Sequence, residues 1–150
     1  MSGQRQETKL SESHLAMLDA SGIEPAIMAE RGYFTATTKD GLRKLGFSEK
    51  QCLVPCLVVP LHNVDGMTGG YQIRPDRPRL CNGKPVKYET ASGQKPLIDV
   101  PPRCREDLLN PLVGLWITEG SKKADCAATF GLCCVSLQGV WNWRGAVGDN

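Results

Sequence analysis

A glutamate-glycine pair stands at the junction between an apolar run and a predicted helix. Glu119 and Gly120 follow the run 113–118 and precede a helix predicted over 121–130. In open α/β sheets, ligands bind at the carboxyl ends of the strands, where the first amides of the next helix also point. A carboxylate there can act as a general acid or base, or help to hold a divalent cation near phosphate. It can equally cap the helix, because acids are favoured at helix N-termini, so the pair alone leaves both roles open.

Basic side chains are concentrated in one segment of a chain whose net charge is only +2. Residues 71–105 hold eight Lys or Arg against three acidic residues, a net charge of +5, and the rest of the chain sums to −3. A basic segment of this kind is typical of a surface that contacts a phosphate backbone. A solvated basic loop explains the charge equally well, so this observation favours neither interpretation without others.

Seven cysteines are present, an odd number with irregular spacing, which argues against a closed disulfide framework. Cys52 and Cys56 have a tolerable first spacing for zinc, but no second pair follows at finger distance. We therefore interpret the thiols as buried, reduced and apolar. The chain shows no signal-peptide pattern and no apolar run of membrane-spanning length, which predicts a cytoplasmic protein without a membrane partner.

The pattern of apolar and turn residues predicts a change of architecture along the chain. Proline, glycine and capping residues indicate three short helices, over 11–18, 24–30 and 38–45. Two β-rich runs joined by an Asp-Gly turn indicate a hairpin, over 53–61 and 69–74. Residues 75–102 are rich in proline, glycine and charge, which predicts a long excursion with few regular elements or one further hairpin. The last part predicts a buried strand, a helix and a strand in a parallel, right-handed crossover, over 113–118, 121–130 and 133–137.

Three segments in order resemble a known family. The stretch from Leu115 to Asp125, with Gly131-Leu132 and Leu137-Gln138-Gly139, resembles the first motif of Toprim domains, which bacterial-type primases and topoisomerases share. Upstream, the segments 56–66 and 70–74 are similar to the primase core that precedes Toprim, and 85–90 is similar to its Pro-Lys-Tyr segment. The resemblance covers roughly residues 52–140. It points to replication proteins of phages, plasmids and other mobile elements rather than to housekeeping primases.

The resemblance implies a role for each matching position. Glu119 would be the Toprim glutamate, a catalytic acid or base or a metal-proximal residue, and Gly120 and Gly139 would allow close approach of the backbone. The phosphate-binding face would be formed by basic residues from three segments, namely Arg74, Lys87, Lys122, Lys123 and Arg144. The lysines of the predicted helix could equally be solvated. Trp141 and Trp143 could stack on bases, although packing is the commoner role of such residues.

One departure from the family pattern bears on activity. Toprim catalysis uses an Asp-x-Asp pair on a later strand to bind magnesium, and this sequence contains no Asp-x-Asp. Mg²⁺ is expected for a complete Toprim site, but we assign no metal ligand here. The chain is therefore expected to be a fragment or truncated product, and whether it is an enzyme on its own stays open.

These observations combine into one set of predictions. The fold is α+β or α/β: a disordered tail over 1–10, a helical and β primase-core-like subdomain over 11–110, and a partial Toprim-like βαβ unit over 111–150. The predicted function is a primase-like DNA-replication protein, with nucleotidyl transfer in a full-length parent. The alternative is a non-catalytic nucleic-acid-binding or replisome-interaction module, and a small phosphate-binding domain is a third possibility. Expected partners are single-stranded DNA or primer-template, nucleotides, and a helicase or a C-terminal domain of the same parent protein.

Overall fold

Two β-sheets organise the chain in the computed structural model, which describes residues 9–138. The first sheet is antiparallel, in the order β1-β2-β3-β6, with strands Phe34–Ala36, Cys56–His62, Thr68–Pro75 and Glu89–Thr90. The second sheet has the order β7-β9-β8, with strands Ile98–Asp99, Cys133–Leu137 and Leu115–Thr118. A separate two-stranded ribbon joins β4 and β5, which span Leu80–Cys81 and Lys84–Pro85. The mixed α+β fold that the sequence predicts is therefore present.

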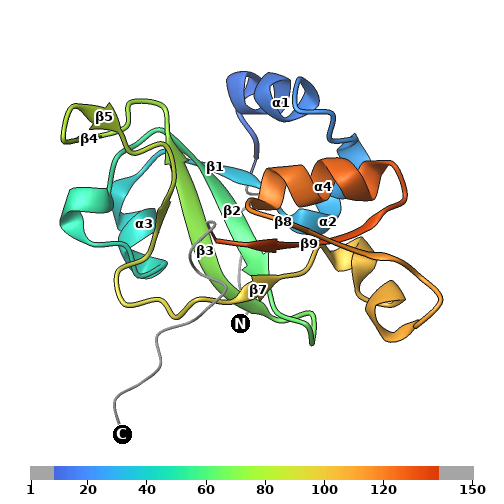
Figure 1. The fold of residues 1–150 in the computed structure, drawn as a ribbon. Helices are drawn as coiled ribbons and strands as arrows, with labels where there is room; N and C mark the ends of the chain where they lie inside the picture. The colour runs from blue at the N-terminus through green and yellow to red at the C-terminus, as the bar shows by residue number, and fades with distance from the viewer. Residues whose placement is uncertain (1–8, 139–150) are drawn as a thin grey trace, which may run out of the picture.

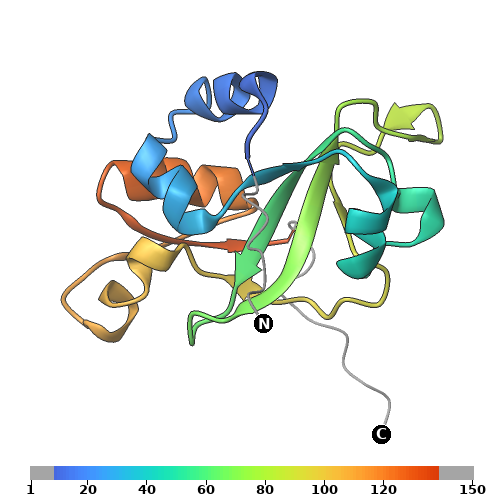
Figure 2. The same ribbon diagram turned by 180° about the vertical axis from the view of Figure 1, so that it is seen from behind.

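Short helices surround these sheets (Figures 1 and 2). The α-helices are α1 (Glu12–Asp19), α2 (Pro25–Arg31), α3 (Lys39–Lys44) and α4 (Ser121–Thr129). Three 3₁₀ turns complete the set: η1 (Glu49–Gln51), η2 (Pro102–Cys104) and η3 (Asp107–Leu109). Among residues 9–138, no helix is long and apolar enough to cross a membrane.

The predicted helix boundaries rest on identifiable caps. Ser11 Oγ accepts a hydrogen bond from the His14 amide at 3.3 Å, and Thr38 Oγ1 accepts one from the Gly41 amide at 3.3 Å. Pro25 occupies the first turn of α2, where its missing N–H costs nothing. Gly32 ends this helix in the left-handed conformation, with φ 80°. These contacts confirm all three helices of the predicted N-terminal segment.

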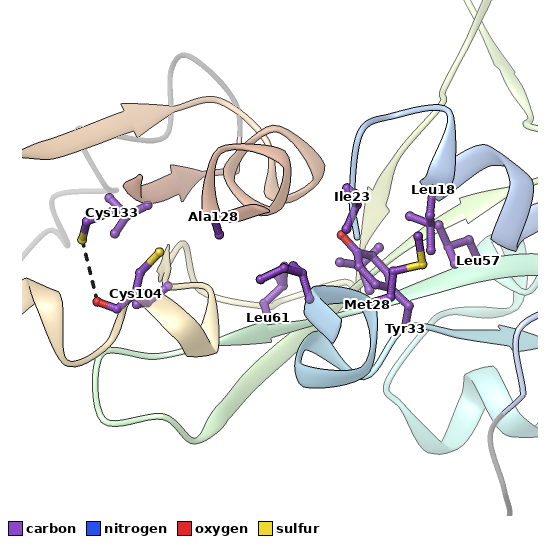
Figure 3. Packing of buried hydrophobic residues seen from close by; sticks show 13 residues of the cluster. Leu18, Ile23, Met28, Tyr33, Leu57, Leu61, Cys104, Ala128 and Cys133 are labelled. Carbon is purple, nitrogen blue, oxygen red and sulfur yellow. Dashed lines mark hydrogen bonds between the residues drawn. The ribbon is translucent and has the colours of Figure 1, made fainter. Parts of the chain in front are cut away.

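The hairpin β2–β3 is the centre of the molecule and separates two apolar cores. Because side chains alternate along a strand, Leu57 and Val59 of β2 face one side, while Cys56 and Val58 face the other. The larger core lies between the hairpin, α1, α2 and the second sheet, and includes Leu57, Leu61, Leu18, Tyr33, Ala128 and Cys133 (Figure 3). The smaller core lies under α3, on the opposite side of the sheet in Figure 1. Both faces of β2 are thus buried.

The second sheet contains the predicted crossover and one strand that the sequence did not indicate. β8 and β9 are parallel and joined by α4, as predicted, and Gly131 ends the connection with φ 76°. β7 adds an antiparallel strand on the other side of β9, with Asp99 opposite Ser136. The segment 75–102 therefore holds the β4–β5 hairpin, β6 and a strand that carries a buried aspartate.

The prediction that residues 113–118 form a buried strand is wrong in its burial. Leu115, Trp116 and Ile117 of β8 are 54%, 59% and 65% exposed. The reason is topological: β8 lies at the edge of its sheet and hydrogen-bonds β9 on one side. The apolar composition of β8 predicts a buried strand, but within residues 9–138 no element covers these side chains.

The cysteines mostly behave as apolar core residues. Five are buried, Cys126 is partly buried and Cys81 is exposed on the β4–β5 hairpin. Burial, with a smaller contribution from Asp76, raises the pKa of the Cys56 thiol to about 12. Because the thiolate is the reactive form, such a thiol is inert at neutral pH.

The start of the described chain is tied to the first sheet. The carbonyl of Lys9 accepts a hydrogen bond from the Thr35 amide at 3.2 Å, and Leu10 packs against the larger core. These two residues belong to the segment 1–10 that the sequence predicts to be a disordered tail; residues 1–8 lie outside the described part.

A buried charge network joins the two sheets. Arg31, at the end of α2, is 1% exposed and donates to both oxygens of Asp125 on α4, at 2.6 and 3.0 Å. Its Nη1 also donates to Asp99 Oδ1 at 2.5 Å and to the Pro60 carbonyl at 3.2 Å. Burial alone would lower the pKa of Arg31, but the charges of Asp125 and Asp99 outweigh that effect and raise it. The guanidinium is therefore held in its charged form.

The remaining lone pairs of the two aspartates are also used. Tyr33 Oη donates to Asp125 Oδ2 at 2.5 Å. Asp99 accepts from the His62 amide at 3.0 Å and from Ser136 Oγ at 3.0 Å. Because buried charges are tolerated when they are fully hydrogen-bonded, this satisfaction is what allows the network to exist.

We predict that Arg31→Met destabilises the fold by about 3–5 kcal/mol, because it leaves two buried carboxylates without their cation. The measurement is urea-induced unfolding followed by circular dichroism. The matched control is Arg103→Met, which removes a half-exposed arginine that pairs with Glu24 and Glu30. The control should cost far less stability, because solvent screens exposed ion pairs, and equal losses for the two variants would contradict the role assigned to Arg31.

Candidate nucleic-acid interface

Glu119 lies where β8 passes into α4. Gly120 is the N-cap of α4 and has an extended backbone, and its carbonyl accepts from the Lys123 and Ala124 amides. No side chain caps the helix at this position. The Glu119 carboxylate instead forms an ion pair with Lys123 one turn later. The capping role that the sequence left open for Glu119 is therefore not the one the structure shows.

Glu119 opens onto a cleft of about 350 Å³ between β3 and the start of α4. The cleft is lined by residues of β2, β3, the segment before β6, and the β8–α4 junction, namely Val59, Gln72, Tyr88, Glu119, Gly120, Ser121, Lys122, Lys123 and Gln138. Gln72 Nε2 donates to Gln138 Oε1 at 3.1 Å across its floor. The cleft thus combines one carboxylate, two lysines, two amides and an aromatic ring.

Arg74 lies beside this cleft and brings a further positive charge to it. Its guanidinium stands over the Tyr88 ring, with Cζ 5.6 Å from the ring centroid, which is a cation–π arrangement. Its Nη1 contacts Met17 Sδ at 2.6 Å. Burial, and then the neighbouring charge of Arg74, lower the pKa of Lys122. Two like charges are therefore brought together at a partly desolvated position.

A second cavity, of about 360 Å³, lies on the other side of Arg74. Its walls come from α1, the end of β3 and the chain that follows, and include Met17, Arg74, Asp76, Lys87 and the prolines Pro75, Pro78 and Pro85. The two cavities share a border at Arg74 and Tyr88. Arg74 lines this cavity, Tyr88 lines the cleft at Glu119, and the Arg74 guanidinium stands over the Tyr88 ring.

His14 borders the second cavity and is a buried polar residue. It is 4% exposed, because α1 packs against the first sheet. Its Nε2 lies 2.8 Å from Asp76 Oδ1, and its Nδ1 lies 2.7 Å from Thr35 Oγ1. With both ring nitrogens engaged, His14 joins α1 to β1 and to Asp76, which directly follows β3.

The basic residues of the chain divide into two groups. Arg31, Arg79 and Arg103 each form ion pairs with carboxylates, so their charge is compensated. Within the described residues, no carboxylate lies within ion-pair distance of Arg74, Lys87 or Lys122. Within residues 9–138 these three cations beside the cavities therefore have no carboxylate partner, whereas Lys123 is paired with Glu119.

The structure brings most of the predicted site residues together, in two neighbouring places. Glu119, Gly120, Lys122 and Lys123 share the first cleft, and Arg74 and Lys87 line the second cavity. Gly139 and Arg144 lie outside the described residues, as do Trp141 and Trp143.

Three contributors were missed from the sequence. Tyr88 follows Lys87 directly, and Gln72 precedes Arg74 by two residues. The period of two along a strand places Gln72 and Arg74 on one face of β3, and this signal could have added Gln72 to the site. Met17 could not have been found this way, because its contact with Arg74 spans 57 residues.

The Toprim resemblance implies a bound Mg²⁺, so we asked which side chains of the described residues could be its ligands. Among residues 9–138 there is no cluster of three or more His, Cys, Asp or Glu side chains that could hold a metal ion. Glu119 is surrounded by lysines, and Mg²⁺ prefers carboxylates and phosphate oxygens. The described residues therefore do not form a magnesium site by themselves, and we derive no catalytic step through one.

Comparisons with known proteins give one partial family match. The family model described as "Domain of unknown function (DUF3854)" matches residues 108–150, less than a third of the chain. No curated protein matches the sequence significantly.

Solved primase structures share the fold. The Aquifex aeolicus primase (zinc-binding and RNA polymerase domains) matches with a TM-score of 0.65 and 13% identity, over 84% of this chain and 36% of that one. The catalytic domain of DnaG primase bound to single-stranded DNA matches with a TM-score of 0.61 and 17% identity, over 91% and 49% of the two chains. A primase domain from Pseudomonas aeruginosa matches with a TM-score of 0.57 and 17% identity, over 83% and 46%. The chain spans less than half the length of these proteins, and what it shares with them is the fold of a primase catalytic core.

We predict that Arg74→Gln raises the pKa of Lys122 towards its ordinary value of 10.5, because the variant removes a neighbouring like charge. The increase should be partial, since burial of the lysine remains. The measurement is a pH titration of the Lys122 side chain by NMR. Lys87→Gln is the control with the same loss of charge and should leave the pKa of Lys122 unchanged. No change in Arg74→Gln would mean that the two cations are not neighbours.

Proposed function

We propose that this chain is the single-strand-binding part of a primase-like DNA-replication protein. One observation carries the proposal: Arg74 and Lys122, two cations without a carboxylate partner among residues 9–138, converge beside the Tyr88 ring at the border of two cavities. Such an arrangement costs stability in the free protein, because like charges repel and burial removes water. A bound phosphate would relieve both costs.

The chemistry of the site fits a polynucleotide. Proteins that bind single strands combine a positively charged groove with aromatic side chains on which bases stack. Tyr88 is the aromatic side chain at the cavities, and Arg74, Lys87, Lys122 and Lys123 supply the charge. The likeness to a DnaG catalytic domain that was solved with single-stranded DNA supports the same class of ligand.

Catalysis is the second candidate function, and Glu119 favours it. The carboxylate stands at the carboxyl end of a parallel strand, beside lysines that can hold phosphates. Nucleotidyl transfer in a full-length parent protein would use Glu119 with Mg²⁺ and with carboxylates that residues 9–138 do not supply. A helicase or a further domain of the same protein is the partner that this role implies, and the cytoplasm is the location.

Binding should weaken with salt and depend on Arg74 and Lys87, the two cations that line the second cavity. We predict that Arg74→Ala/Lys87→Ala reduces the affinity for a fluorescent single-stranded oligonucleotide by about tenfold at low salt, and reduces the slope of log K against log salt by about 1.4. The measurement is fluorescence anisotropy across a salt series.

The matched control for this experiment is Lys44→Ala/Lys50→Ala, which removes the same charge from α3 and η1. Figure 1 shows that α3 lies on the opposite side of the first sheet from α1 and α4. The control should bind with nearly wild-type affinity. If both double variants lose the same affinity for the oligonucleotide, binding would depend on general electrostatic attraction and not on a site at Arg74 and Lys87. Binding of free nucleotides without any preference for polynucleotide would favour a small phosphate-binding domain instead.

A second experiment separates binding from catalysis. We expect no template-dependent dinucleotide synthesis by this chain with Mg²⁺ and nucleoside triphosphates, and we expect Glu119→Gln to bind single strands at least as tightly as the wild type, since it removes a charge that repels phosphate. The measurements are radiolabelled product analysis and the same anisotropy assay. Synthesis that disappears in Glu119→Gln would instead establish this chain as catalytic.

A further inference from the structure

The two cavities lie side by side along β3, and their sizes are nearly equal. One has about 360 Å³ and the other about 350 Å³. Gln72 lines one and Arg74 lines the other, and because they are two residues apart on one strand, their side chains leave the same face of the sheet about 7 Å apart. The cavities are thus consecutive positions on one track and not two unrelated hollows.

Two cations and an aromatic ring form the border between the two cavities. The guanidinium of Arg74 lies over the Tyr88 ring, and its Nη1 contacts Met17 Sδ, so one face and one end are held by neighbours. Lys122 approaches from the start of α4 closely enough for Arg74 to lower its pKa. Arg74 and Lys122 therefore place two positive charges at the border between the cavities.

Each cavity also has an apolar wall that suits a base. The cavity beside α1 has Met17, Pro75, Pro78 and Pro85 next to its polar lining residues Ser13, His14, Asp76 and Lys87. The cleft at Glu119 has Val59 and the Tyr88 ring, with the Gln72 amide beside them. Flat apolar walls accept the face of a base, and an amide can hydrogen-bond a base edge.

We propose that the two cavities hold two consecutive nucleotides of one single strand, and that the phosphodiester between them lies on Arg74 and Lys122. This rests on the proposed single-strand function and adds a defined unit to it: a two-nucleotide step, one base on each side of the Arg74–Tyr88 border. A continuous basic groove would bind a strand without such a unit.

The test is the dependence of affinity on ligand length. Thymidine oligonucleotides of one to six nucleotides, each with a 5′-phosphate, compete with a fluorescent strand for the protein. Affinity should rise about tenfold or more from one nucleotide to two, as the second base and the shared phosphate engage. Each further nucleotide should add clearly less.

A variant that fills one cavity sharpens the test. Ser13 is exposed at the mouth of the cavity walled by Met17 and the prolines, and Ser13→Trp should occupy it. The dinucleotide should then bind Ser13→Trp no more tightly than the mononucleotide, whose affinity should be unchanged. Ser92→Trp, at an exposed position outside both cavities, is the control and should keep the full length dependence.

The outcomes separate this inference from the function on which it rests. Equal gains for every added nucleotide, with no effect of Ser13→Trp, would overturn the two-nucleotide step and leave single-strand binding standing. Calorimetric binding of two separate thymidine monophosphates per chain, without a gain for the dinucleotide, would also overturn it. If no oligonucleotide binds at any length, the proposed function fails, and the two-nucleotide step fails with it.

Discussion

The fully buried guanidinium of Arg31 is the contact on which the relative placement of the two sheets depends. It joins the end of α2 to Asp99 on β7 and to Asp125 on α4, and through Pro60 it reaches β2. An apolar core tolerates small shifts of one layer over another, whereas bidentate and shared hydrogen bonds fix direction as well as distance. The cleft at Glu119 lies between β3 of one sheet and α4 beside the other. Its shape is therefore set by a charge network that does not itself line it.

Local structure could be predicted well because its causes are local. Thr38, Pro25 and Gly131 each fix an end of an element through their own backbone or a neighbour three residues away. The β2–β3 hairpin and the parallel β8–α4–β9 crossover follow from apolar runs and a turn. The Arg31 network could not be predicted, because its partners lie 68 and 94 residues away and no periodicity connects them. β7 was missed for a related reason: two residues have no period, and Asp99 gives no sign of being a strand residue.

The candidate site shows the same division. The residues near Glu119 could be grouped from sequence because they are consecutive around one strand-to-helix junction. The proximity of Arg74 and Lys122 could not be predicted from the sequence. Arg74 comes from β3 of the first sheet, and Lys122 comes from α4, which connects two strands of the second sheet. The burial of His14 could not be predicted either, because its partners Asp76 and Thr35 are distant in sequence. The sequence therefore predicts which helices and strands form, but it does not predict which of them lie next to one another in space.

The exposed edge strand β8 also has a consequence for how the chain is made. A ribosome releases Leu115–Thr118 before α4 and before β9, the one strand that β8 pairs with among the described elements. During that interval a short apolar segment with free backbone groups is available to any similar segment nearby. The flanking residues counter this hazard: Pro111 and Gly114 precede the strand and disfavour extended pairing, and Glu119 with Lys122 and Lys123 places charge directly after it. The lysines that we propose to contact phosphate would thus also protect the nascent chain from aggregation.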